Sequence, residues 1–406
     1  RAIMKKADLS ANKSNLNLEW FMGIMSGTSL DGVDLAAVCF HGDQIHDIVT
    51  HYVEYPEALR TELAHTALSP TFNCIQFGEL QVKLGKFYAD CALQFTQQPK
   101  YQAKIGQQEL KAIGNHGQTI RHHPKGAHAF TMQIGDPHYL CMALKTPICY
   151  DFRSMDMAAQ GQGAPLAPLF HEAFFPSAPD LKQSVYTVVL NLGGIANITV
   201  LEHKITGEIK THACDTGPAN TLLNQWVYRH LKQSFDKNGA WGASGECNIT
   251  LLQRLLQHPY FEAPTPKSTG PEIFNIDWLD SQLKSLNLSN EDVQATLYHF
   301  TVESVAMHIE KLLSQTHSSS GQNKIIIAGG GTRNPLLMEL LQTRLATLAV
   351  VMSSEDFNLD PEFLEAAAFA WLAKQRFYNK PVNTFNFTGA TQPIVLGSMI
   401  VPAFID

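Results

Sequence analysis

Charge is scarce in this chain of 406 residues, and that scarcity excludes several classes of protein. Charged residues make up 17% of the sequence, below the ~25% of an average soluble domain. The 30 basic and 37 acidic residues give a net charge of −7 without basic stripes, so we expect no nucleic-acid partner. Hydrophobic residues make up 45% of the chain, more than a disordered protein carries. The chemistry must therefore rest on a few acids and on many small polar residues.

Long apolar runs, paired cysteines and a targeting signal are also missing. No segment approaches the ~18 uninterrupted apolar residues of a membrane-spanning helix, so we expect no membrane partner. The seven cysteines are widely spaced and form no C-x-x-C pair, which favours free thiols in a reducing cytoplasm over disulfides or zinc. Residues 1–18 begin basic but lack the apolar core of a secretory signal, and we interpret them as a polar leader.

Short apolar runs alternate with amphipathic stretches, which is the pattern of an α/β protein. An apolar run from Phe21, a small-residue turn and a second run that ends at Phe40 predict a β-hairpin. The same order recurs over residues 186–201, which predicts two related halves. Helices are expected over residues 77–91, after Ser289, over 336–345 and over 362–376, from apolar spacing and capping signals.

Three glycine-rich turns follow apolar strands, at residues 26–32, 193–197 and 329–332. Glycine lets backbone N–H groups approach closely, so each turn could hold phosphate oxygens. A tight turn is the better explanation of each one taken alone, but three in one chain, two of them on matching hairpins, favour a nucleotide held between two lobes. The candidate nucleotide ligands are Gly27, Thr28, Ser29, Leu30, Asp31, Gly32, Val33 and Asp34, then Gly193, Gly194 and Asn197, then Gly329, Gly330, Gly331 and Asn334.

This order of hairpins, turns and helices resembles the sugar kinase and actin superfamily. The resemblance implies an α/β, ribonuclease H-like ATPase fold in which two lobes hold ATP in a central cleft. We assign residues 19–150 plus about 361–406 to lobe I and residues 151–360 to lobe II.

Several ordered motifs narrow the resemblance further. They include Gly23-Ile-Met-Ser-Gly-Thr-Ser-Leu-Asp-Gly-Val-Asp34, Gly114-Asn-His-Gly-Gln-Thr119, Asp151-Phe-Arg-Ser-Met-Asp156 and Asp215-Thr-Gly-Pro218. Together they resemble the anhydro-N-acetylmuramic acid kinase family, from about residue 20 to the C-terminus. The resemblance implies an enzyme that uses ATP and Mg²⁺, opens the 1,6-anhydro bridge of this amino sugar with water and phosphorylates O6. N-acetylmuramic acid 6-phosphate and ADP, formed in peptidoglycan recycling, would be the products, and the family also suggests a homodimer.

The resemblance assigns the catalytic base to Asp215 and makes Glu365 a partner that orients the attacking water. The residues alone leave an alternative for each. Asp215 would suit the N-cap of a helix opened by Pro218. Glu365 would suit the first turns of a helix, where the macrodipole favours an acid.

The polar segment over residues 114–156 supplies the candidate sugar ligands. A short strand over 110–114 would place His116 on a loop, where a structural role is the alternative. Arg153 could bind the lactyl carboxylate through its guanidinium fork, or pair with Asp151 or Asp156. The candidates are His116, Gln118, Thr119, Asp136, Asp151, Arg153 and Asp156.

The protein ligands of the metal stay unassigned at this point. Met25 and Asn191 stand where many superfamily members carry an acid, so Mg²⁺ would be held through water and ATP oxygens. Asp31 is a weak metal candidate, since an aspartate that shapes the turn is equally plausible. The role of Lys267 and its neighbours is open.

Two other functions compete with the kinase. One is an actin-like ATP-binding switch without a sugar substrate. The other is a glycoside hydrolase with an Asp/Glu pair, although hydrolysis alone needs no phosphate turns.

Overall fold

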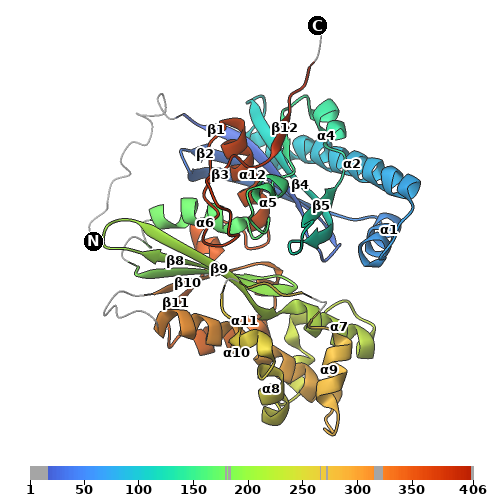
Figure 1. The fold of residues 1–406 in the computed structure, drawn as a ribbon, viewed down its shortest axis with the longest axis vertical. Helices are drawn as coiled ribbons and strands as arrows, with labels where there is room; N and C mark the ends of the chain where they lie inside the picture. The colour runs from blue at the N-terminus through green and yellow to red at the C-terminus, as the bar shows by residue number, and fades with distance from the viewer. Residues whose placement is uncertain are drawn as a thin grey trace, which may run out of the picture.

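Two mixed β-sheets organise the chain in this computed structural model (Figure 1). The structure describes residues 17–178, 181, 184–265, 267–270, 273–314 and 323–403. Residues 1–16 of the predicted polar leader therefore lie outside the described residues.

The first sheet has the strand order β12-β6-β4-β1-β2-β3, and β5 pairs with β4. Strands β1, β2 and β3 form an antiparallel meander, whereas β1, β4 and β6 run parallel to one another. The strands are β1 (Glu19–Ser26), β2 (Gly32–His41), β3 (Gln44–Glu54), β4 (Leu110–His123), β5 (Phe130–Ile134), β6 (Ile148–Tyr150) and β12 (Ser398–Ile400).

The second sheet repeats this plan in the order β11-β10-β7-β8-β9. Strands β7, β8 and β9 form an antiparallel meander, and β7, β10 and β11 run parallel. The shared topology confirms the two related halves and the actin-like fold, while the residue ranges of the lobes stay a prediction. The strands are β7 (Tyr186–Leu192), β8 (Ile195–His203), β9 (Ile209–Pro218), β10 (Lys324–Ala328) and β11 (Val350–Ser353).

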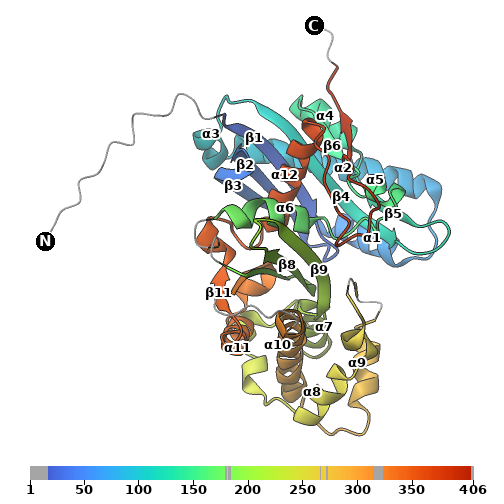
Figure 2. The same cartoon turned by 60° about the vertical axis from the view of Figure 1, so that its left-hand side comes forward.

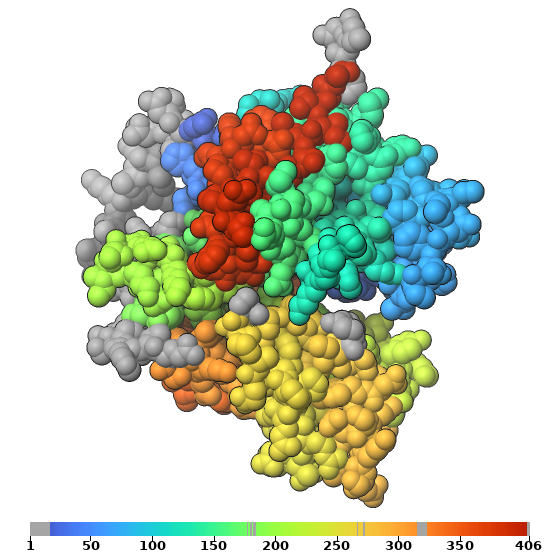
Figure 3. All heavy atoms as spheres, in the orientation of Figure 1, coloured from blue at the N-terminus to red at the C-terminus, as the bar shows by residue number. Residues whose placement is uncertain are grey.

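Helices cover both sheets. The described residues of the range 250–314, coloured yellow to orange, gather at one end of the molecule, and the described blue and red segments lie toward the other (Figure 3). Near the first sheet lie α1 (Glu57–Leu68), α2 (Cys74–Gln97), α3 (Pro99–Lys104), α4 (Pro137–Leu144), α5 (Ser154–Ala158) and α12 (Leu364–Phe377). With the second sheet go α6 (Ala167–Phe174), α7 (Asn220–Leu231), α8 (Ile249–Leu256), α9 (Ile276–Leu283), α10 (Asn290–Ser314) and α11 (Pro335–Leu345).

Helix α12 docks closely on the first sheet because β1 and β4 carry glycine at the contact points. A Cβ at Gly23 would lie 1.8 Å from the carbonyl oxygen of Ala366, and one at Gly114 would lie 2.2 Å from that of Phe369. Helix α6 contacts α12 as well as β8 and β9, so it bridges the two sheets (Figure 2). The apolar core around α12 contains residues of both sheets, such as Phe21 and Val189.

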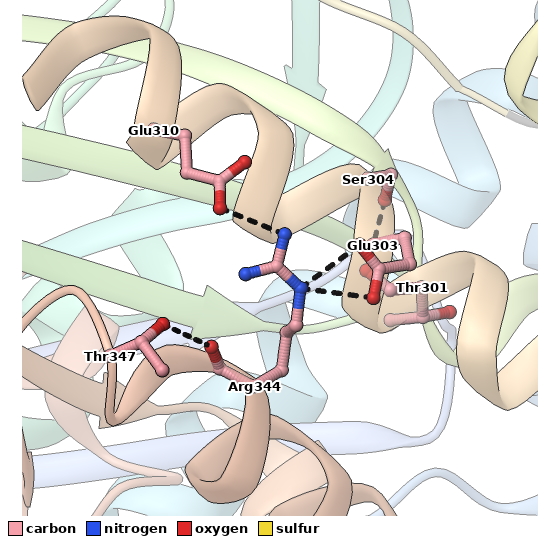
Figure 4. A network of polar contacts seen from close by, with 6 residues as sticks. All are labelled: Thr301, Glu303, Ser304, Glu310, Arg344 and Thr347. Atoms are coloured by element: carbon pink, nitrogen blue, oxygen red, sulfur yellow. Dashed lines mark hydrogen bonds and ion pairs between the residues drawn. The ribbon is translucent and has the colours of Figure 1, made fainter. Parts of the chain in front are cut away.

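An ion-pair network joins α10 to α11 (Figure 4). The Nε of Arg344 lies 3.0 Å from both carboxylate oxygens of Glu303, and its Nη2 lies 2.9 Å from Oε1 of Glu310. All three side chains are partly exposed, so each pair adds at most about 1 kcal/mol to stability.

The predicted elements are confirmed, with three corrected boundaries. The strand predicted over 110–114 extends to His123 because it continues to pair with β5, so His116 lies within a strand and not on a loop. Helix α12 begins at Leu364, not at residue 362, and α7 begins at Asn220, beyond Pro218.

The prediction of free thiols is confirmed. All seven cysteines are free thiols. Among the described residues, no group of three or more His, Cys, Asp or Glu side chains could hold a metal ion. The described helices include none with the length and apolar character needed to span a bilayer.

The close docking of α12 predicts that Gly23→Ala destabilises the protein. The added methyl group meets helix backbone, which no change of rotamer relieves, so we expect a loss of about 3 kcal/mol in the free energy of unfolding. Urea denaturation measures it. Gly78→Ala is the control, because open space surrounds this α2 residue and alanine favours a helix. Equal effects of the two substitutions would contradict the prediction.

Candidate active site

The first glycine turn joins β1 to β2 and is open to solvent. Oδ1 of Asp31 accepts hydrogen bonds from the Ser29 hydroxyl at 2.7 Å and from the Gly32 N–H at 3.0 Å. Thr28 and Ser29 are exposed, and a Cβ at Gly27 would meet nothing closer than 3.6 Å. Asp31 therefore shapes a turn that leaves room for an anion, and its metal role stays a prediction.

The second and third turns lie against each other. Asn220, at the start of α7, donates its side-chain N–H groups to the carbonyls of Gly193 at 2.8 Å and Leu192 at 3.2 Å. Gly329 has a φ of +88°, and a Cβ there would lie 2.5 Å from Oδ1 of Asn191. The Gly329 N–H donates to the carbonyl of Pro361 at 2.8 Å. The third turn thus connects the end of β7 to the segment that leads into α12.

Carboxylates gather between the first turn and the start of α12. Burial, together with the nearby carboxylates of Asp31, Glu365, Glu362 and Asp360, raises the pKa of Asp34 to about 8. Glu362 also forms an ion pair with Arg333 of the third turn. The sequence pattern predicted only a helix from residue 362. The signal for Asp360 and Glu362 was their position beside Glu365 in an acid-rich segment.

Glu365 faces Arg153 at the site. Burial raises the pKa of Glu365, and the positive charge of Arg153 partly opposes this rise. Burial also lowers the pKa of Arg153 to about 10, still far above neutral, so the guanidinium stays charged. The structure therefore brings one predicted catalytic acid and one predicted sugar ligand together.

His116 is a neutral acceptor for Arg153. Its Nδ1 lies 2.7 Å from the carbonyl oxygen of Gly117 and must carry the proton in that contact. Its Nε2 is then the lone-pair acceptor for Arg153, with Nε at 3.2 Å and Nη2 at 2.8 Å. Burial holds the pKa of His116 well below its usual range, with a further contribution from the charge on Arg153. His116 therefore orients Arg153, as the structural alternative suggested.

Asp215 lies on β9 of the second sheet. Its Oδ2 accepts the Thr269 N–H at 2.9 Å, its own N–H donates to the Lys267 carbonyl at 3.0 Å, and Tyr260 donates its hydroxyl to the Asp215 carbonyl at 2.7 Å. The helix-cap alternative is wrong, because α7 begins five residues later at Asn220.

Lys267 is engaged within the loop that holds Asp215. Its Nζ donates to the Tyr260 carbonyl at 2.7 Å and lies 4.5 Å from the centre of the Tyr260 ring. This contact with protein atoms supports a role in fixing the loop.

The remaining sugar candidates have hydrogen-bond partners within the protein. Asp136 caps α4 through the His138 N–H at 2.9 Å, and Asp151 accepts from Ser154. Fully buried Asp156 accepts from the Gly163 N–H at 2.7 Å and from the hydroxyls of Thr384 and Thr388 at 2.5 and 2.8 Å. Thr119 accepts from Gln133 at 3.2 Å.

Arg153 forms no ion pair with Asp151 or Asp156 in the described part of the chain, and direct sugar contacts of these residues stay predictions.

Asn334 lies just beyond the third turn, as predicted. Its side chain caps α11 by accepting the Leu337 N–H at 3.2 Å, and it donates to the Tyr298 hydroxyl at 2.7 Å. Burial and the nearby Asp236 carboxylate raise the pKa of Tyr298. A direct contact between Asn334 and a nucleotide stays a prediction.

Comparisons with known proteins agree on one family. The sequence model of the family "Anhydro-N-acetylmuramic acid kinase" matches residues 19–402. The chain is 40% identical to the protein of that name from Pasteurella multocida, over 94% of this chain and 96% of the relative. It is 39% identical to that from Vibrio cholerae, over 95% of this chain and 99% of the relative. Among solved structures, a dehydratase activator from Clostridium difficile shares 9% identity over 89% of this chain and 96% of its own, with a TM-score of 0.41, and adds nothing to the assignment.

The carboxylate cluster predicts that Asp34→Asn stabilises the ligand-free protein more strongly as the pH rises. At pH values between the ordinary aspartate pKa and about 8, Asp34 is protonated in the folded state and ionised in the unfolded state. The stability that this bound proton gives the wild-type fold therefore falls as the pH rises and is lost above about 8. Asparagine stays neutral throughout. The melting temperature of the variant should exceed that of the parent by more at pH 8 than at pH 5.

The exposed Asp90→Asn serves as the matched control and should show no such trend. A pH-independent difference for Asp34→Asn would contradict the raised pKa.

Proposed function

Because the chain belongs to the anhydro-N-acetylmuramic acid kinase family, we propose that it opens the 1,6-anhydro bridge of anhydro-N-acetylmuramic acid and phosphorylates O6 with ATP. The structural observation that carries the proposal is the meeting of three parts at one place: the open first glycine turn, half-buried Glu365 and charged Arg153. An actin-like switch without a substrate would have no need of the last two.

The reaction requires one group that removes a proton from water. Water attacks C1, the bond from C1 to O6 breaks, and O6 takes the γ-phosphoryl group while ADP leaves. We assign Asp215 as the base that takes the proton from this water, because the Thr269 N–H holds the Asp215 carboxylate in place. Glu365 orients the same water. Phosphoryl transfer to O6 stabilises the leaving alkoxide, so the protein's main task is to position these groups.

Phosphates would bind mainly to backbone N–H groups. The first turn fits this task because Gly27 has open space, and Gly330 of the third turn meets nothing closer than 3.8 Å. The carboxylate oxygens of Asp31 and Asp34 are the type of ligand that Mg²⁺ prefers, so these residues would fit a bound Mg²⁺. Neither is assigned as a ligand. When bound, Mg²⁺ would neutralise charge on the transferring phosphoryl group.

Arg153 would bind the lactyl carboxylate of the sugar. Its Nε and Nη2 point at neutral His116, so the other N–H groups of the fork can reach an anion. No hydrogen bond joins Arg153 to a carboxylate within the described ranges.

We also propose that the enzyme acts in the cytoplasm, where its buried free thiols stay reduced, and that it forms a homodimer, as the family resemblance implies.

We expect Asp215→Asn to abolish turnover while ATP still binds, because asparagine keeps the side-chain shape but cannot accept the water's proton. The assay supplies the anhydro-sugar, ATP and Mg²⁺ and follows ADP and sugar phosphate. The wild-type protein must release ADP only when sugar is present. Near-normal turnover in the variant would reject Asp215 as the base, and ring opening without ATP would favour a hydrolase.

We expect Arg153→Gln to raise the KM for the sugar about 10- to 100-fold, the cost of losing a charge-assisted hydrogen bond, and to leave the KM for ATP unchanged. The matched test uses an anhydro-sugar that lacks the lactyl group. With that substrate the variant and the wild type should show similar KM values. An equal loss with both sugars would place Arg153 elsewhere than on the carboxylate.

A further inference from the structure

Gln118 is fully buried, and both ends of its side-chain amide already have partners. Its Oε1 accepts the Tyr55 hydroxyl at 3.1 Å, and its Nε2 donates to the carbonyl oxygen of Gly27 at 3.0 Å. A ligand could reach this amide only by breaking bonds that burial makes costly to lose. Gln118 is therefore poorly placed to contact the sugar directly.

A second set of hydroxyl contacts joins the same two strands. The Ser26 hydroxyl donates to the Gly117 carbonyl at 3.1 Å, so the Tyr88 hydroxyl, 2.6 Å from Ser26 Oγ, is the donor in that contact. Ser26 lies opposite Gln118 in the parallel pairing of β1 with β4, and the register shifts just before this pair. Side-chain hydrogen bonds thus join the strands where regular pairing is interrupted.

The bond to Gly27 also fixes the direction of a neighbouring donor. The carbonyl of Gly27 and the N–H of Thr28 belong to one planar trans peptide and point in opposite directions. The Gly27 carbonyl also accepts the Leu30 N–H within the turn at 3.3 Å. Because the shorter bond from Gln118 draws this carbonyl toward the buried interior, the Thr28 N–H must point away from it. Thr28 is exposed, so its N–H faces the side from which a ligand arrives.

We propose that Gln118 is a positioning residue that sets the orientation of the first glycine turn for the phosphates of ATP. The Tyr55 hydroxyl in turn fixes which way the Gln118 amide faces. This inference rests on the proposed function only in taking the first turn as a phosphate site.

The test is direct measurement of ATP binding by calorimetry, without sugar. Gln118→Met keeps the length and burial of the side chain but removes both hydrogen bonds. We expect it to raise the Kd for ATP about tenfold, which corresponds to about 1.4 kcal/mol. Tyr55→Phe removes the bond to Oε1 and the 3.3 Å contact with the Tyr88 hydroxyl but leaves the Gln118 bond to Gly27, so it should raise the Kd only about threefold.

Gln108→Met is the matched control at the far end of the same strands. The Gln108 amide also binds at both ends, to the Trp20 ring N–H at 3.2 Å and the Lys104 carbonyl at 3.1 Å, but it is exposed and lies away from the turn. We expect its Kd to stay within twofold of the wild type. Melting temperatures confirm that each protein is folded during titration.

Unchanged ATP affinity in folded Gln118→Met would overturn the proposal. If that variant fails to fold, unchanged affinity in Tyr55→Phe overturns it instead. A rise in the KM for the sugar that equals the rise in the Kd for ATP would also overturn it, in favour of a direct sugar contact. A wild-type protein that binds ATP without turning over sugar would reject the proposed function and leave this inference standing.

Discussion

The contact between helix α12 and the backbone of β1 and β4 is the constraint on which the site depends. Glycine at positions 23 and 114 lets helix and strand backbones approach so closely that no side chain fits between them. Such a contact cannot slide, since backbone atoms have no alternative rotamers. It therefore fixes the first turn of α12, and with it Glu365, relative to the first glycine turn at the end of β1 and to His116 within β4. Helix α6 extends this fixed arrangement to the second sheet.

Repulsion between carboxylates at the site lowers the stability of the fold, and packing keeps these carboxylates in place despite that repulsion. Burial and several nearby carboxylates raise the pKa of Asp34 to about 8. Such repulsion persists only where the surrounding structure determines the positions of the groups. The two supports are the docking of α12 behind Glu365 and the hydrogen bonds that Asp31 makes to its own turn. Sites with perturbed carboxylates of this kind are more often functional than structural.

The sequence predicted the fold better than the roles of individual residues. Hairpins and helix starts follow from local patterns, and apolar runs with capping signals were sufficient to find them. Side-chain roles depend on contacts that are distant in sequence. Asp156 looked available for a sugar, but Thr384 and Thr388 enclose it from more than 200 residues away. His116 was expected on a loop because the strand pattern fades after Gly114, whereas pairing with β5 continues the strand to His123.

Arg333 and Arg153 differ in the groups that neutralise their positive charge. Under the proposed function, this difference distinguishes the binding places of ATP and of the sugar. Arg333, beside the third glycine turn, forms an ion pair with Glu362, so it offers little net charge to phosphates. Arg153 has neutral His116 as its hydrogen-bond partner, and its charge is opposed only through space by Glu365. Under the proposed function, an incoming carboxylate is attracted to Arg153, and phosphates rely on backbone N–H groups. In this proposal the two anions are distinguished because Arg153, unlike Arg333, has no hydrogen-bonded carboxylate partner among the described residues.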